Sequence, residues 1–150
     1  MTSRVPELID ALVARCTADE ALADVMVTDG PEVSASSADD WLLIGFDGNA
    51  EGDFEAAQTV GGWCSLQTDR EEQLQIPVAA VATRGDTDVR AARVRVYEIG
   101  ARLEQLLRAD PGVGLPSLEV AIEASQLVQD QTTDGVQARL VLTVAGRAFT

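Results

Sequence analysis

The feature that most constrains the fold is a long amphipathic stretch at residues 88–109. Its apolar residues recur at spacings of three and four positions, which places them on one face of an α-helix. They are Val89, Ala92, Val96, Ile99, Leu103 and Leu106. Asp86 or Thr87 is expected to cap the first turn, and Pro111-Gly112 stops the helix. A helix with one apolar stripe needs a surface to cover, and packing on a sheet is the default.

Two alternating segments follow this helix and predict part of that sheet. Residues 118–124 and 136–144 alternate apolar and polar side chains, as half-buried strands do. The turn sequence Thr132-Thr133-Asp134-Gly135 joins them into a hairpin. We therefore expect an antiparallel sheet in which one row of the last strand faces the helix. That row is Val136, Ala138, Leu140, Leu142 and Val144.

The N-terminal part of the chain predicts a second helix and a buried strand. Pro6 suits the first turn of a helix, and apolar residues at helical spacing continue over residues 6–23. A short apolar run at 25–28 and a Ser-rich polar stretch at 32–40 follow. Residues 41–46 are then apolar without alternation, which is typical of a strand covered on both faces.

Two further alternating segments complete the expected sheet. Residues 54–67 are predicted to form a long strand with a bulge or bend at Gly61-Gly62. Its apolar residues share one side of the strand, namely Phe54, Ala56, Val60, Cys64 and Leu66. Residues 74–83 form the next strand, and Pro77, which lacks an N–H group, predicts an edge position or a kink there. The whole order predicts a single α+β domain over residues 1–150. Its largely antiparallel sheet carries two α-helices on one face and ends in a C-terminal β-hairpin.

Missing residue types exclude most common catalysts. The chain has no histidine and no lysine, and all 11 of its cations are arginines. Without histidine there is no Ser-His-Asp or Cys-His constellation and no imidazole metal site, and without lysine there is no Schiff base or P-loop. We therefore expect no enzyme and no cofactor. The two cysteines, Cys16 and Cys64, are too few for a disulfide scaffold and are expected to be small buried apolar residues.

The charge is distributed unevenly along the chain. Residues 1–75 carry 16 acids and 3 arginines, whereas residues 76–150 carry 9 acids and 8 arginines. Such an acidic surface repels phosphate and argues against direct DNA binding, although solubility alone also explains a net charge of −14. No apolar run approaches the length of a membrane span, and Glu7 and Asp10 interrupt any signal peptide. We expect neither membrane association nor export.

The glycine-rich acidic segment 47–53 partly imitates a calcium-binding loop. The bidentate Glu required at the twelfth position is Gln58 here, and the flanking segments are predicted strands rather than helices. A plain connecting hairpin loop is therefore favoured over a metal site. Its acids Asp47, Glu51 and Asp53 are candidates for a surface that faces a lumen or a partner.

Several stretches together resemble a known family. The opening of the long helix, Gly85-Asp86-Thr87-Asp88-Val89-Arg90, and the closing hairpin at residues 130–140 are similar to tail proteins of long-tailed bacteriophages of actinobacteria. Residues 3–12 and 41–45 fit the same pattern, and the closest likeness is to the tail terminator (tail-completion) family. The resemblance implies an α+β subunit that closes into a ring, typically of six, on the head-proximal end of the tail tube.

The same resemblance implies the partners of such a ring. It would stop tube polymerisation, bind the tail tube protein and present a docking surface for the head–tail connector or stopper protein, while DNA passes through without specific binding. It would be found in the neck region of the virion tail, and in the host cytoplasm during assembly. Two other interpretations remain. One is a different ring of the neck or tail, such as a head–tail stopper or tube subunit, and the other is a soluble acidic adaptor that binds a protein.

Charge asymmetry also suggests where subunits of a ring would meet. The acidic half of one subunit would contact the arginine face of the long helix of the next, with Arg95 and Arg102 at the interface. The alternative is that these arginines pair within their own chain, for example as Glu98 with Arg102. Both interpretations are compatible with the sequence.

Overall fold

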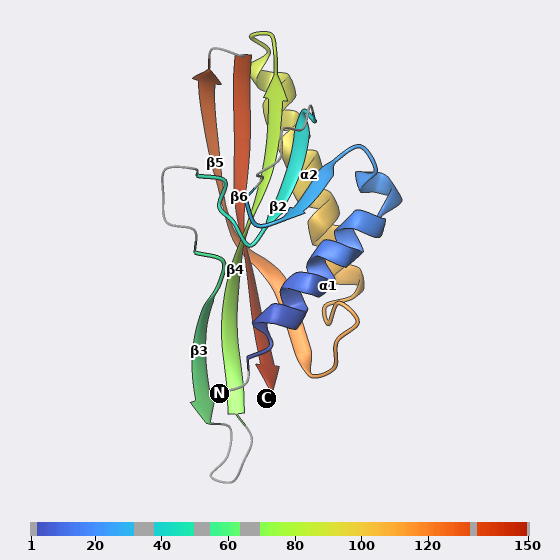
Figure 1. Cartoon of the computed structure of the whole chain (residues 1–150), viewed down its shortest axis with the longest axis vertical. Helices are drawn as coiled ribbons and strands as arrows, with labels where there is room; N and C mark the ends of the chain where they lie inside the picture. Colours follow the sequence, from blue (N-terminus) through green and yellow to red (C-terminus); the bar gives the residue numbers. More distant parts are fainter. Residues whose placement is uncertain (1–2, 32–37, 50–54, 64–69, 133–134, 150) are drawn as a thin grey trace.

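The computed structural model describes residues 3–31, 38–49, 55–63, 70–132 and 135–149. Its elements are α1 (Val5–Ala18), the 3-10 helix η1 (Glu20–Leu22), β1 (Met26–Asp29), β2 (Asp40–Ile44), β3 (Gln58–Trp63), β4 (Arg70–Arg84), α2 (Val89–Ala109), β5 (Leu118–Thr132) and β6 (Gly135–Phe149). The six strands form one sheet in the order β1-β2-β4-β6-β5, and β3 pairs with the first part of β4. Strands β1 and β2 are parallel, and the other pairs described are antiparallel. The expected α+β fold with a largely antiparallel sheet and a C-terminal hairpin is therefore confirmed (Figure 1).

One face of the sheet packs against α2, which crosses behind the strands in Figure 1. All five residues of β6 expected on this face are buried. Gly100 allows α2 to approach closely, because a Cβ atom there would lie 2.9 Å from Cδ2 of Leu140. The predicted apolar stripe of α2 is buried from Ala92 to Leu103. Val89 in the first turn is 40% exposed, and in the last turn Leu107 is buried whereas Leu106 is only half-buried.

The ends of the two helices differ from the expected ones. Helix α1 stops at Ala18 rather than continuing to residue 23, because Asp19 adopts an extended backbone and a 3-10 turn follows. Asp88 caps α2, with its Oδ1 accepting a 3.0 Å hydrogen bond from the N–H of Ala91. The cap is therefore neither of the two predicted residues, Asp86 and Thr87, and Asp86 instead accepts from the N–H of Asp88. It therefore supports the cap from outside the helix.

Strand β2 is covered on both faces, as its unbroken apolar run predicts. Leu42 and Ile44 belong to the main core under the helices. Leu43 lies on the opposite, open face, in a small cluster with Phe46, Ala79 and Val81. The chain after β2 turns back across this open face, where the N–H groups of Gly45 and Phe46 both donate to the carbonyl of Pro77.

Pro77 lies in a central strand, so the prediction of an edge strand was wrong. Strand β4 pairs with β6 along one side and with β2 and β3 along the other. The N and C=O of a strand residue point to the same side, and the carbonyl of Pro77 points toward the end of β2. On this side of β4, the pairing with β2 stops at Val78, opposite Ile44, and the pairing with β3 stops at Gln75, opposite Gln58. The missing N–H therefore falls in the gap between two neighbouring strands.

Strand β3 departs from its prediction in two ways. Residues 50–54 and 64–69 of the expected strand lie outside the described part of the chain. Within β3 the register is regular, with Gly61 opposite Glu72 and Gly62 opposite Glu71, so the predicted bulge was wrong. Val60, on the apolar side expected from the alternation, is not buried, because its side chain is 69% exposed on the open face. Neither described α-helix covers that face, so the alternation of apolar and polar residues in β3 does not indicate which side chains are buried.

Strand β5 is longer than predicted and forms an edge of the sheet. It pairs with β6 from Leu118 to Thr132, with a register shift between Ile122 and Ala124. At the other end of the hairpin, the guanidinium of Arg4 donates to the carbonyls of Phe149 and Pro116, at 3.3 and 2.8 Å. These bonds fasten the start of α1 to the end of β6, and the two chain ends lie close together in Figure 1.

Candidate assembly surface

Arg102 is held by a carboxylate of its own chain. Its Nε and Nη2 donate to the two oxygens of Asp19 at 2.7 and 2.8 Å, which is the planar two-bond geometry that guanidinium and carboxylate favour. The side chain of Asp19 is only 8% exposed. The hydrogen bonds from Arg102 lower the pKa of Asp19 below its usual value. This pair fixes the point where α1 ends against the middle of α2.

Arg95 joins three acids from different elements. Its Nε donates to Asp40 at 2.8 Å, and its other nitrogens reach Asp24 at 2.9 Å and Glu98 at 3.2 Å. Asp40, 12% exposed at the start of β2, also accepts from Arg84 at 2.7 Å. Burial raises the pKa of Asp40, but the hydrogen bonds from Arg84 and Arg95 outweigh this effect and hold the pKa below its usual value.

Both arginines proposed for a subunit interface therefore make the intrachain pairs that the sequence left open as the alternative. The partners differ from the expected one, since Glu98 pairs with Arg95 and Arg102 pairs with Asp19. Helix spacing predicts Glu98 and Arg102 as neighbours, but Asp19 offers Arg102 a less exposed carboxylate. One pair at the i,i+4 spacing is present on this helix, between Glu104 and Arg108, at 2.8 Å.

The opposite flank of α2 carries arginines with no acidic partner among the described residues. Arg93 donates to the side-chain oxygen of Gln129 in β5 at 3.3 Å, and Gln129 in turn donates to the carbonyl of Val89. Arg90, one turn earlier, is exposed. These residues form an arginine corner, consisting of Arg90 and Arg93, beside the β5 edge of the sheet.

Acids gather at the other edge of the sheet. Glu20, Asp24 and Asp29 are exposed in or near η1 and β1, and the side chain of Asp24 is 73% exposed despite its contact with Arg95. We call these three residues the acidic edge. Because β1 and β5 end the sheet on opposite sides, the acidic edge and the arginine corner lie on opposite sides of one molecule.

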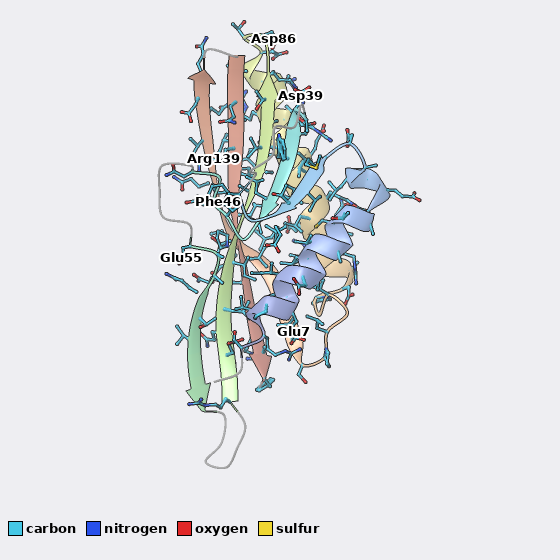
Figure 2. All side chains as sticks on the ribbon, viewed as in Figure 1. Glu7, Asp39, Phe46, Glu55, Asp86 and Arg139 are labelled. Carbon is cyan, nitrogen blue, oxygen red and sulfur yellow. The ribbon has the colours of Figure 1, made fainter. Side chains whose placement is uncertain are left out.

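The acidic loop lies partly on the open face of the sheet. Arg139 of β6 donates to the carbonyl of Asp47 at 2.7 Å, and the Oδ1 of Asp47 accepts from the N–H of Asn49. Figure 2 shows Arg139 and Phe46 near each other on this face. Glu51 and Asp53 lie outside the described residues. Among those described, no three potential metal ligands cluster, and no helix has the length and apolar character needed to cross a membrane.

A groove of about 920 Å³ is lined by residues of β3, β4, β5 and β6 and by the C-terminal part of α2, including Glu104 and Leu107. Its lining is mixed, with Gln58, Val60, Gln73 and Gln75 from β3 and β4, and with Glu119 and Arg147 among the charged residues. Arg147 pairs with Glu71 at 3.1 Å. The groove therefore combines polar, charged and apolar side chains.

Comparison of the chain with protein-family models gives no match, and comparison with curated protein sequences gives none either.

Proposed function

We propose that the protein is a structural subunit of the tail terminator type. It forms a ring, of six subunits in the simplest case, on the head-proximal end of a phage tail tube. The ring stops tube polymerisation and offers a docking surface to the head–tail connector or stopper protein. The subunit is soluble in the host cytoplasm during assembly and becomes part of the virion neck, and DNA passes through the ring without specific binding.

The observation that carries this proposal is that the two most distinctive family-like stretches form one surface. Arg84, just before the first stretch, pairs with Val136 inside the second. A Cβ atom at Gly135, whose φ is +125°, would lie 1.9 Å from the carbonyl oxygen of Arg84, so this close approach requires glycine. Gln129, just before the second stretch, donates a hydrogen bond to the carbonyl of Val89 in the first. Residues distant in sequence thus build a common end of the molecule, marked by Asp86 in Figure 2.

The charge of the protein is also suited to such a ring. With a net charge of −14, the ring would repel DNA phosphates rather than retain them. Opposite charges on opposite sides of one subunit favour head-to-tail contacts, which generate a closed ring when the rotation between subunits closes. Exposed ion pairs contribute about 0–1 kcal/mol each, so they would select the orientation, and buried apolar area would supply most of the affinity.

The test combines a mass measurement with a capping assay. The purified protein is measured by native mass spectrometry and then added to polymerising tail tube protein, and tube lengths are counted by electron microscopy. We expect a closed ring and shorter tubes that carry a ring at one end. Unchanged tube lengths in the presence of a ring would favour a stopper, whereas polymerisation of the protein itself would identify a tube subunit. A protein that stays monomeric or dimeric and does not affect tubes would be an adaptor, and the terminator proposal would fall.

A further inference from the structure

The two free edges of the sheet match each other row by row. Following the strand pairing across the sheet, Val27 of β1 lies in the same row as Leu42, Ala80, Leu140 and finally Leu127 of β5. The three inner residues of this row are buried in the main core, whereas Val27 and Leu127 are only partly buried. The apolar row therefore runs the full width of the sheet and stops, half-covered, at both edges.

Neighbouring rows show the same match. The adjacent row has Met26 at its β1 end and Val128 at its β5 end, and Met26 is 41% exposed. The next rows toward the other end of β1 finish in polar residues at both edges, with Thr28 level with Gln126 and Asp29 level with Ser125. Two apolar and two polar pairs thus lie at matching heights on opposite sides of one subunit.

Strand direction fits the same arrangement. Strand β1 runs parallel to β2 and therefore opposite to β4, whereas β5 runs in the same direction as β4. A second copy related by rotation about an axis parallel to the strands keeps its strand direction, and each of its residues keeps its position along that axis. It would bring its β1 beside β5 as an antiparallel pair, with no shift along the strands. Antiparallel pairing is the arrangement of the sheet's own central strands.

The middle part of the β5 edge lacks the features that usually prevent such pairing, whereas β1 is short and carries one charge, Asp29, at its end. Natural edge strands are protected by charges, prolines or bulges. In β5 the irregularity lies between Ile122 and Ala124, and the six residues from 124 to 129 include neither a charge nor a proline. Among the described residues, no backbone hydrogen bond from another element reaches the outer side of β1 or of this part of β5.

The charges next to these edges are complementary. Continuing the register by one residue places Gln129 of one copy opposite Val25 of the next, beside Asp24 of the acidic edge. Arg93 of the arginine corner is hydrogen-bonded to Gln129. The contact would therefore bring a guanidinium without an acidic partner toward an exposed carboxylate.

From these observations we propose that β5 of one copy pairs with β1 of a second copy, with Leu127 opposite Val27 and Val128 opposite Met26. This contact rests on the ring proposed above and names the surfaces that form it. Each subunit uses a different edge on each side, so the contact is heterologous and continues the sheet from one subunit to the next. The occupant of the free β5 edge is thus a second copy of this chain.

Engineered cysteines test the register directly. In the Val27→Cys/Leu127→Cys variant the two thiols of one copy lie four strand spacings apart, roughly 19 Å, and cannot join each other. Across the proposed contact their Cβ atoms would be about 4.5–5.5 Å apart, which permits a disulfide after small adjustments. After oxidation we expect a ladder of covalent oligomers on a non-reducing gel, ending at the number of subunits in the ring. The matched control, Val27→Cys/Val128→Cys, places the thiols on opposite faces and should give no ladder. The oxidised wild type shows how much of any covalent ladder comes from the native cysteines, Cys16 and Cys64.

A mass measurement of the same samples separates this inference from the proposed function. Assembly without a ladder, or an equal ladder from the control, overturns the strand pairing and leaves the ring intact. A ladder that extends into filaments supports the pairing and overturns the terminator role. Failure to assemble at the highest soluble concentration overturns both.

A charge reversal provides the second arm of the test. Arg93→Glu should weaken assembly at low salt, and added salt should partly restore it, because the change places like charges beside the acidic edge of the next copy and salt screens their repulsion. Arg108→Glu, at the other end of the same helix, is the matched control and should assemble as the wild type does. Equal behaviour of the two variants would overturn the placement of the arginine corner at the contact.

Discussion

Replacing Leu103 by alanine tests how α2 is fastened to the sheet. Leu103 is 1% exposed and belongs to the main core. The substitution removes three side-chain carbons, which at about 0.8 kcal/mol per buried methylene is roughly 2.4 kcal/mol of transfer free energy. The cavity that remains adds to this loss, so we expect the free energy of unfolding to fall by about 3–4 kcal/mol. In a chain of this length each kcal/mol lowers the melting temperature by roughly 2–4 °C.

Leu106→Ala is the matched control, because it makes the same chemical change in the same helix at a half-buried position. Its helix propensity changes equally, so any difference between the two variants reports packing. We expect a loss of about 1 kcal/mol for Leu106→Ala. Urea denaturation followed by circular dichroism measures both variants. Equal losses, or a loss below about 1 kcal/mol at Leu103, would refute the packing of α2 described above.

Three further results are expected. Because hydrogen bonds from two arginines keep the pKa of Asp40 below its usual value, its carboxylate stabilises the fold above about pH 4, and this contribution disappears as the pH falls further. Asp40→Asn should therefore cost about 2–3 kcal/mol in urea unfolding at pH 7, and less at pH 3. Burial raises the pKa of Cys16 from 9.0 to about 11, so stability should decline between these pH values as the unfolded thiol ionises, and Cys16→Ala should remove that decline. Isothermal titration with calcium should show no micromolar site in the 47–53 loop, because Gln58 stands where the bidentate glutamate is required.

Local periodicity correctly predicted the elements that bury one clear face in the core. The α2 stripe and the buried row of β6 repeat at the spacing of their own secondary structure, so neighbouring residues suffice to identify them. Strands at the margin of the sheet gave weaker signals. Val60 alternates with polar residues but is exposed, and β5 continues beyond Ala124 through residues that do not alternate. Edge strands have less to bury, and their sequences are correspondingly less patterned.

Long-range partners could not be read from the sequence. Arg102 finds Asp19 across 83 positions, and Arg95 finds Asp40 across 55. Nothing near either arginine distinguishes these acids from the many others, and the i,i+4 rule indicated a different pair. The candidate surface changed for the same reason. Only the pairing of all strands showed that Val27 and Leu127 lie at one height on opposite edges.

Strand β3 has an unusual place in the sheet that bears on how the molecule opens. Among the described residues it pairs with β4 alone, and Gln58, Thr59, Val60 and Gly61 are exposed. Strand β4 keeps its bonds to β6 whether or not β3 is attached. Detaching β3 would uncover little apolar surface, so this opening should require far less free energy than global unfolding. In native-state hydrogen exchange, we expect the β3 amides to exchange well before those of β4 opposite β2, with the rest of the molecule still folded.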